Sequence, residues 1–104
     1  MFDQIQELSA LLDDTVHKMA KYGKDAAESN LAYRKRVKEE VLRERDKGTP
    51  TTIIMAIVKG TCADDEFKRD CADVFYKAAI EKIQIIKKQM EMLNDEINRE
   101  WGKK

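Results

Sequence analysis

The sequence predicts an all-α fold, a long antiparallel helical hairpin with a short apolar helix at its tip. Charged residues make up 38% of the 104 residues, and the chain has one Pro and four Gly. Long solvated helices have such a composition, whereas sandwiches and barrels need more turn residues. Apolar residues also recur at helical spacing in two long segments, with one group of turn residues between them. We therefore predict a single domain over residues 1–104.

The first long helix is predicted over residues 2–46. One face of this segment is apolar or small, with residues at steps of three and four: Ile5, Leu8, Leu12, Thr15, Val16, Met19, Tyr22, Ala26, Ser29, Tyr33, Val37 and Val41. Such spacing keeps one side of a helix buried. Gly23 lies inside the segment and costs about 1 kcal/mol relative to Ala. We expect the helix to be locally soft there without ending.

A turn and a short helix follow, the helix being predicted over residues 50–59. Gly48 suits the left-handed residue just after a helix, Thr49 is a favourable N-cap, and Pro50 fits a first helical position. The body of this helix, residues 53–58, is the most apolar part of the chain, and Gly60 is the predicted stop. A buried strand competes with this interpretation because β-branched residues dominate. The matched start and stop signals favour the helix.

The second long helix is predicted from Cys62 or Ala63 to Trp101. Its first turn is acidic, which suits the positive end of a helix dipole. Its apolar stripe is wide, with pairs of neighbours at several levels: Phe67, Cys71, Val74, Phe75, Ala78, Ala79, Ile83, Ile86, Met90, Leu93, Ile97 and Trp101.

The two long helices are expected to pair in an antiparallel way, because only a short connector separates them. The facing positions should then have numbers that sum to about 109, which places Tyr33 near Tyr76 and Met19 near Met90. A hairpin of this length buries only one seam, so its stability is marginal unless a second apolar strip is covered. We therefore expect self-association into a helical bundle, with a dimer favoured.

The charge pattern and the cysteines narrow the classes of function. Twenty basic residues balance twenty acidic ones, so the chain lacks the long-range positive field that favours nucleic acid or an anionic membrane. No stretch is apolar enough to span a bilayer and no leader is evident, which predicts a cytoplasmic protein. Cys62 and Cys71 would lie about 13 Å apart along one helix, too far for a disulfide. With His17 as the single histidine, no zinc site is expected, and we predict no cofactor.

Several short motifs resemble a family of small helical proteins encoded by phages and prophages of Gram-positive bacteria. The motifs are Val41-Leu42-Arg43, Gly48-Thr49-Pro50-Thr51-Thr52, Lys68-Arg69-Asp70, Phe75-Tyr76-Lys77-Ala78-Ala79 and Arg99-Glu100-Trp101. The similarity covers nearly the whole chain, although Cys71 stands where an aliphatic residue is expected. Such proteins are often encoded near early or replication genes. The resemblance therefore implies the cytoplasm of a bacterial host, and a phage or host replication protein as a partner.

The first functional hypothesis is a non-enzymatic protein–protein interaction module. Its contact surface would be the exposed part of the apolar tip helix, formed by Ile53, Ile54, Met55, Ile57 and Val58. Exposed apolar patches of this kind mark interaction sites.

The alternative hypothesis is a nucleic-acid-binding accessory of phage replication or recombination. The basic residues concentrated near the end of the first helix would contact phosphates: Arg34, Lys35, Arg36, Arg43 and Arg45. Acidic residues dilute this stretch, so a solvated helix face with ion pairs four residues apart explains the same charges.

A third and weaker hypothesis is a Mg²⁺-dependent nucleotide hydrolase. It requires Glu40 and Glu44 to face Asp70 and Asp73 across the hairpin, because a hard divalent cation needs clustered carboxylates. Surface pairs between these carboxylates and neighbouring basic residues are the competing explanation.

Overall fold

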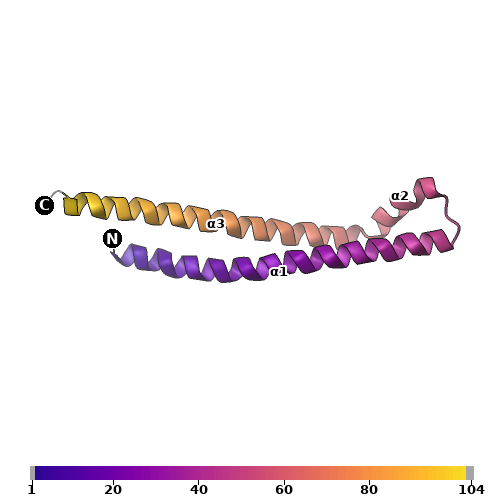
Figure 1. Ribbon diagram of the computed structural model, residues 1–104, viewed down its shortest axis with the longest axis horizontal. Helices are drawn as coiled ribbons and strands as arrows, with labels where there is room; N and C mark the ends of the chain where they lie inside the picture. The colour runs from indigo at the N-terminus through magenta and orange to yellow at the C-terminus, as the bar shows by residue number, and fades with distance from the viewer. Residues whose placement is uncertain (1, 103–104) are drawn as a thin grey trace.

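A computed structural model describes residues 2–102, which form three helices: α1 (Phe2–Asp46), α2 (Thr51–Thr61) and α3 (Ala63–Gly102). The prediction of an all-α fold is confirmed, since residues 2–102 contain no strand. The long helices α1 and α3 run side by side in opposite directions, so both ends of the chain lie at the same end of the rod (Figure 1). The molecule measures 82 × 21 × 13 Å. We call the end with both termini the open end, and the other the closed end.

The turn after α1 is built from backbone hydrogen bonds and one left-handed residue. The amide of Lys47 donates to the carbonyl of Arg43 at 3.1 Å, and the amide of Gly48 to that of Arg45 at 3.0 Å. Gly48 has φ +80°, which confirms its predicted conformation. Glycine adopts this conformation without the steric penalty of a side chain, so the chain can reverse within residues 47–50.

The predicted capping of α2 by Thr49 is wrong. The Thr49 hydroxyl donates to Oε2 of Glu44 at 2.6 Å, and the N-cap of α2 is Pro50, which makes no side-chain capping bond. A hydrogen bond to a charged carboxylate is stronger than one between neutral groups, which explains why the hydroxyl turns toward Glu44 of α1 and not toward an amide of α2. The hydrogen bond from Thr49 and the nearby Lys47 ammonium also lower the pKa of Glu44.

The second helix continues through Gly60, which is not the stop that the sequence predicts. The helix ends at Thr61, and Cys62 forms the break with φ −98° and ψ 13°. The Cys62 amide still donates to the Val58 carbonyl at 2.9 Å, and its own carbonyl accepts from Glu66 at 3.0 Å. The chain therefore bends at a fully buried cysteine while most of its backbone hydrogen bonds are kept.

The second helix packs lengthwise along the last part of α1, above it in Figure 1, and this changes the register of the whole rod. Ile54, Val58 and Cys62 form a buried cluster against Tyr33, Val37 and Val41 of α1. Because α2 occupies the return path beside the end of α1, α3 begins only beside Arg36, which lies 3.9 Å from Asp65 in the first turn of α3.

The predicted register is consequently wrong by about two to three helical turns. Arg69, rather than Tyr76, lies over the ring of Tyr33, at 4.4 Å from its centroid. Tyr76 packs on Gly23, where an added Cβ would lie 3.1 Å from Cε1 of the tyrosine ring. Gly23 thus gives the ring room between the helices, and α1 continues through it.

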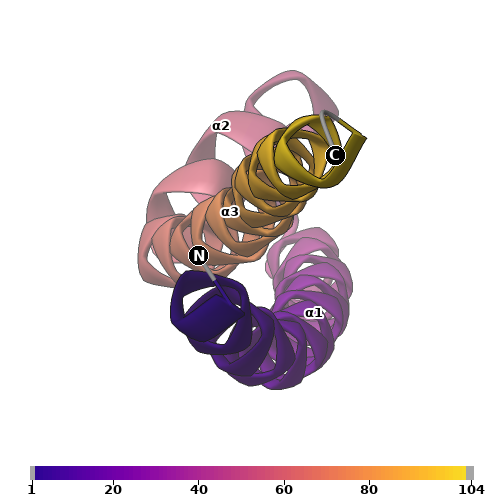
Figure 2. The same ribbon diagram turned by 90° about the vertical axis from the view of Figure 1, so that its left-hand side faces the viewer.

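The apolar stripe of α3 divides into an inner and an outer part. Ala79, Ile83 and Ile86 are buried against α1. Thr15 of α1 is also buried, and its hydroxyl donates a hydrogen bond to the Leu11 carbonyl at 2.7 Å. Seen along the rod, α3 lies beside α1 (Figure 2). One partner helix covers only part of the width of this stripe. Five members of the stripe stay exposed: Phe67, Val74, Phe75, Ala78 and Trp101.

Two glycine substitutions test these helix ends. Gly60→Ala should raise the free energy of unfolding by about 0.5–1 kcal/mol, because Gly60 is helical and nothing lies within 4 Å of an added Cβ. Gly48→Ala should lower it by about 1–2 kcal/mol, because φ +80° is strained for any side chain. Urea denaturation measures both. A loss of stability in Gly60→Ala would show that α2 needs glycine at this position.

Candidate interaction surface

The predicted contact residues of α2 point in two directions. Ile54 and Val58 are 4% and 1% exposed because they pack on α1, so they are part of the molecule's own core. Ile53, Met55 and Ile57 are exposed, with Ile53 and Ile57 on one flank of α2 and Met55 on the opposite flank. The surface that α2 offers to a partner is therefore smaller than the sequence predicts and contains three of the five residues.

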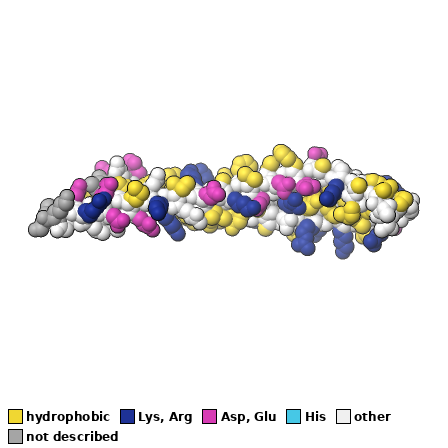
Figure 3. Space-filling view, turned by 90° about the horizontal axis from the view of Figure 1, so that it is seen from above, with side chains coloured by type: hydrophobic (Ala, Val, Ile, Leu, Met, Phe, Trp, Pro, Cys, Tyr) yellow, Lys and Arg dark blue, Asp and Glu magenta, His cyan; other side chains and the backbone are white. Residues whose placement is uncertain are grey.

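A larger apolar surface lies on α3, where sequence reasoning placed core residues. Phe67 and Val74 are 71% and 63% exposed, and Ile85 and Met92 are each 59% exposed. Phe67 and Val74 also line a shallow hollow of about 200 Å³, together with Cys71 and Phe75. Hydrophobic side chains lie exposed along the rod in the view of Figure 3. The widened stripe in the sequence was the signal for this second surface.

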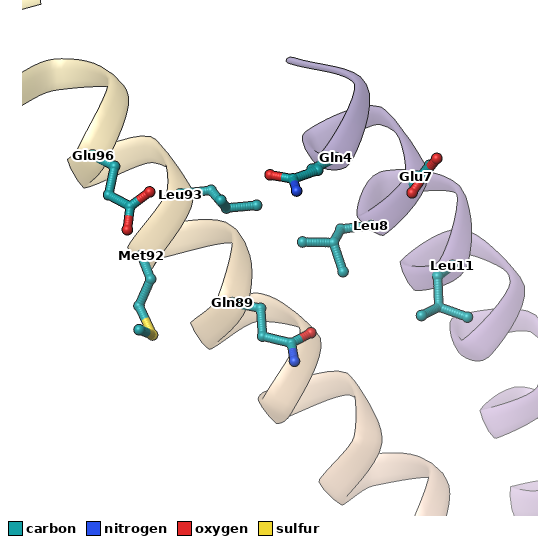
Figure 4. A pocket seen from close by; sticks show the side chains of 8 residues that line it. All are labelled: Gln4, Glu7, Leu8, Leu11, Gln89, Met92, Leu93 and Glu96. Atoms are coloured by element: carbon teal, nitrogen blue, oxygen red, sulfur yellow. The ribbon is translucent and has the colours of Figure 1, made fainter. Parts of the chain in front are cut away.

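A groove between α1 and α3 borders this surface. Near its middle, the rings of Tyr22 and Phe75 stack with their centroids 5.9 Å apart. At the open end the groove holds a hollow of about 490 Å³, where Leu8 and Leu93 point toward one another between the helices (Figure 4). Gln4, Gln89 and Glu96 also line this hollow. Apolar side chains thus form the floor and polar ones the rim.

Charge is distributed unevenly along the rod. Residues 2–14 carry four acidic and no basic side chains, and residues 91–102 carry four acidic side chains and one basic. These two ranges are therefore strongly acidic, with a net charge of −7, which is balanced by an excess of five basic groups in residues 15–90 and by Lys103 and Lys104. A balanced total charge conceals this asymmetry.

The five basic residues of the nucleic-acid hypothesis form two groups. The Nε of Arg36 and the Nη1 of Arg43 lie 3.1 and 2.7 Å from Oε1 of Glu40, a carboxylate that is only 4% exposed. Arg36 also approaches Asp65 of α3 at 3.9 Å. Their role is thus to neutralise a buried charge. The other three residues, Arg34, Lys35 and Arg45, are exposed.

The four carboxylates of the magnesium hypothesis do not face one another. Glu40 is held by the two arginines, and Glu44 accepts from Thr49. Asp70 lies 2.9 Å from Arg69, and Asp73 lies 2.8 Å from Lys77. The changed register is the reason, since the end of α1 lies beside α2 and not beside the start of α3. Over residues 2–102, no three His, Cys, Asp or Glu side chains are grouped to hold a metal ion.

The two thiols differ in environment, which gives a direct test of the bend between α2 and α3. Burial raises the pKa of Cys62, so this thiol stays protonated and shielded, whereas Cys71 is only half-buried. At neutral pH a thiol reagent such as dithionitrobenzoate should label Cys71 quickly. Cys62 should react only at the rate of unfolding, because the thiolate is the reactive form and the buried thiol stays protonated. Equal fast labelling of both would show that α2 detaches readily.

Comparisons of the chain with models of protein families, with curated proteins and with solved structures found no match. Within residues 2–102, no helix combines the length and the apolar character that crossing a membrane requires. The proposals below are therefore based on the geometry and chemistry of the chain itself.

Proposed function

We propose that this protein is a non-enzymatic, self-associating module for protein–protein interaction. The proposal is based on the solvent-accessible surface area of the chain. The accessible surface is 8064 Å², whereas a compact monomer of 12.1 kDa is expected to expose about 6,000 Å². The excess of about 2,000 Å² on each chain amounts to about 4,000 Å² for a pair, which lies in the range that obligate homodimer interfaces bury in total.

The exposed residues have the chemistry that association requires. The radius of gyration is 23.0 Å, against about 13 Å for a compact domain of this length, so the core formed within one chain is thin. Large apolar side chains are exposed along α3 and on α2. Burying them against another helical surface supplies the stabilisation that one inner seam lacks.

The exposed side of α2 fits a second role, contact with a different protein. Ile53 and Ile57 lie one helical turn apart on one flank of α2 near the closed end, and Met55 is exposed on the opposite flank. Methionine adapts its shape to varied apolar partners. We assign this site to a phage or host replication protein in a bacterial cytoplasm, which is the setting that the sequence resemblance implies.

Solution mass tests the proposal. Light scattering at micromolar concentration should give about twice the chain mass of 12.1 kDa, and the value should be the same at low and high salt. Apolar burial does not weaken as salt screens charge. A mass of 12.1 kDa up to high micromolar concentration would exclude self-association.

A nucleic-acid-binding accessory remains the second candidate, supported by one observation. Arg34, Lys38 and Arg45 recur at helical spacing on α1 and are exposed, so three cations lie along one side of the helix. If each neutralises one phosphate, binding to single-stranded oligonucleotide should weaken by about 20-fold between 50 and 200 mM salt. Fluorescence anisotropy measures this dependence, and a lack of binding at 50 mM salt would remove the candidate.

A further inference from the structure

The outer face of α3 repeats with the period of a coiled-coil seam. Eight positions alternate at steps of four and three residues along this helix. They are Phe67, Cys71, Val74, Ala78, Glu81, Ile85, Lys88 and Met92. Six of them are apolar or small, and seven are exposed, with Cys71 half-buried. A sustained repeat of this kind is the pattern by which one helix packs along another.

The arrangement of this outer seam matches a second copy of itself. When two such helices lie antiparallel, with the symmetry axis between Ala79 and Ile80, Phe67 of one copy meets Met92 of the other. Val74 then meets Ile85, and all eight positions find a counterpart. A two-fold interface must be self-complementary in this way.

From this pattern we infer that two copies dimerise through the outer seams of their α3 helices, aligned antiparallel so that each open end lies toward the closed end of the other copy. The inference rests on the proposed self-association and specifies its surface and orientation. Together with α1 of each copy, the two α3 helices would form a four-helix assembly with α3 at its centre.

The charges select the antiparallel orientation. A parallel pair would place Lys88 against Lys88 and Glu81 against Glu81, and would bring the two acidic open ends together. In the antiparallel pair Lys88 meets Cys71 of the other copy, so the two Lys88 residues lie about 25 Å apart along the seam. Glu81 meets Ala78, so the two Glu81 residues are offset by about one turn and not directly opposite. The two acidic ends then lie at opposite ends of the dimer. Like charges placed directly opposite each other disfavour a pairing, so the parallel alternative is suppressed.

A single substitution tests the register, because Cys71 is native and faces Lys88 of the other copy. Lys88→Cys should form a covalent dimer under mild oxidation with copper–phenanthroline. Within one chain, residues 71 and 88 lie about 25 Å apart along α3, far beyond disulfide reach. The double variant Cys71→Ala/Lys88→Cys is the matched control and should not cross-link, because its two new cysteines are also about 25 Å apart.

The outcomes separate this inference from the proposed function. Cross-linking of Lys88→Cys alone, with wild type and the double variant uncross-linked on a denaturing gel, supports the antiparallel seam. Cross-linking of wild type through Cys71 would demonstrate a parallel seam and overturn the inference. A dimeric mass by light scattering without any cross-link in Lys88→Cys would also overturn it, leaving self-association intact. A monomeric mass for reduced wild type and Lys88→Cys would overturn both.

Discussion

Replacement of Val58 by Asp should lower the free energy of unfolding by about 4 kcal/mol and the Tm by about 15 °C or more. Val58 is 1% exposed and sits in the cluster that α2 forms with Val37 and Val41 of α1. A carboxylate placed there is desolvated, and no cationic group belongs to this cluster. Thermal melting followed by circular dichroism measures the change.

Ile57→Asp is the matched control on the neighbouring position of the same helix. Ile57 is 37% exposed, so the same new charge remains hydrated and the loss should be less than about 1 kcal/mol. This variant should instead weaken binding of the partner that we propose for the closed end. Equal destabilisation by the two substitutions would contradict the observed orientation of α2 on α1.

Removing Arg36 and Arg43 together should destabilise the protein by about 3 kcal/mol. Both guanidinium groups lie within 3.1 Å of Oε1 of Glu40, whose side chain is 6% exposed. Without them a buried carboxylate loses its compensating charge, and such losses typically reach about 3–5 kcal/mol. Because the arginines themselves are partly exposed, water reaches the site and the lower part of this range applies. Urea denaturation of the Arg36→Ala/Arg43→Ala variant measures the effect.

A rescue variant and a control variant identify the cause. Adding Glu40→Leu to the double variant should restore most of the lost stability, because an apolar side chain of similar size needs no charged partner. Arg34→Ala/Lys35→Ala removes the same number of charges from the exposed side and should change the free energy of unfolding by less than about 0.5 kcal/mol. If the Arg34 and Lys35 variant were the more destabilised, the assignment of a structural role to Arg36 and Arg43 would be wrong.

This distribution of roles also defines how nucleic-acid binding should be examined. Arg36 and Arg43 serve the fold through Glu40, so a loss of binding in variants of these two residues would not identify a phosphate contact. Arg34, Lys38 and Arg45 are the informative positions, because their removal leaves the buried ion pair intact.

Local chemistry in the sequence accounts for the helices and for part of the turn. The three- and four-residue steps predict α1 over the range that the structure shows, since they depend only on the period of a helix. The left-handed Gly48 follows from its lack of a side chain. The hydrogen bond from the Thr49 hydroxyl to Glu44 could not be predicted, because capping of α2 and a contact with α1 are both local options and the geometry of the turn decided between them.

By itself, then, the sequence determined the all-α class and the apolar character of residues 53–58, because period and composition act within one element. Tertiary structure alone decided that α2 lies along α1, which shifts the register of α3 by about two to three turns. This shift separates the four carboxylates of the magnesium hypothesis and places Arg69 over the ring of Tyr33. It also decided which half of the wide α3 stripe is buried. Packing one helix against another covers a single strip, and which strip is covered depends on where the chain turns.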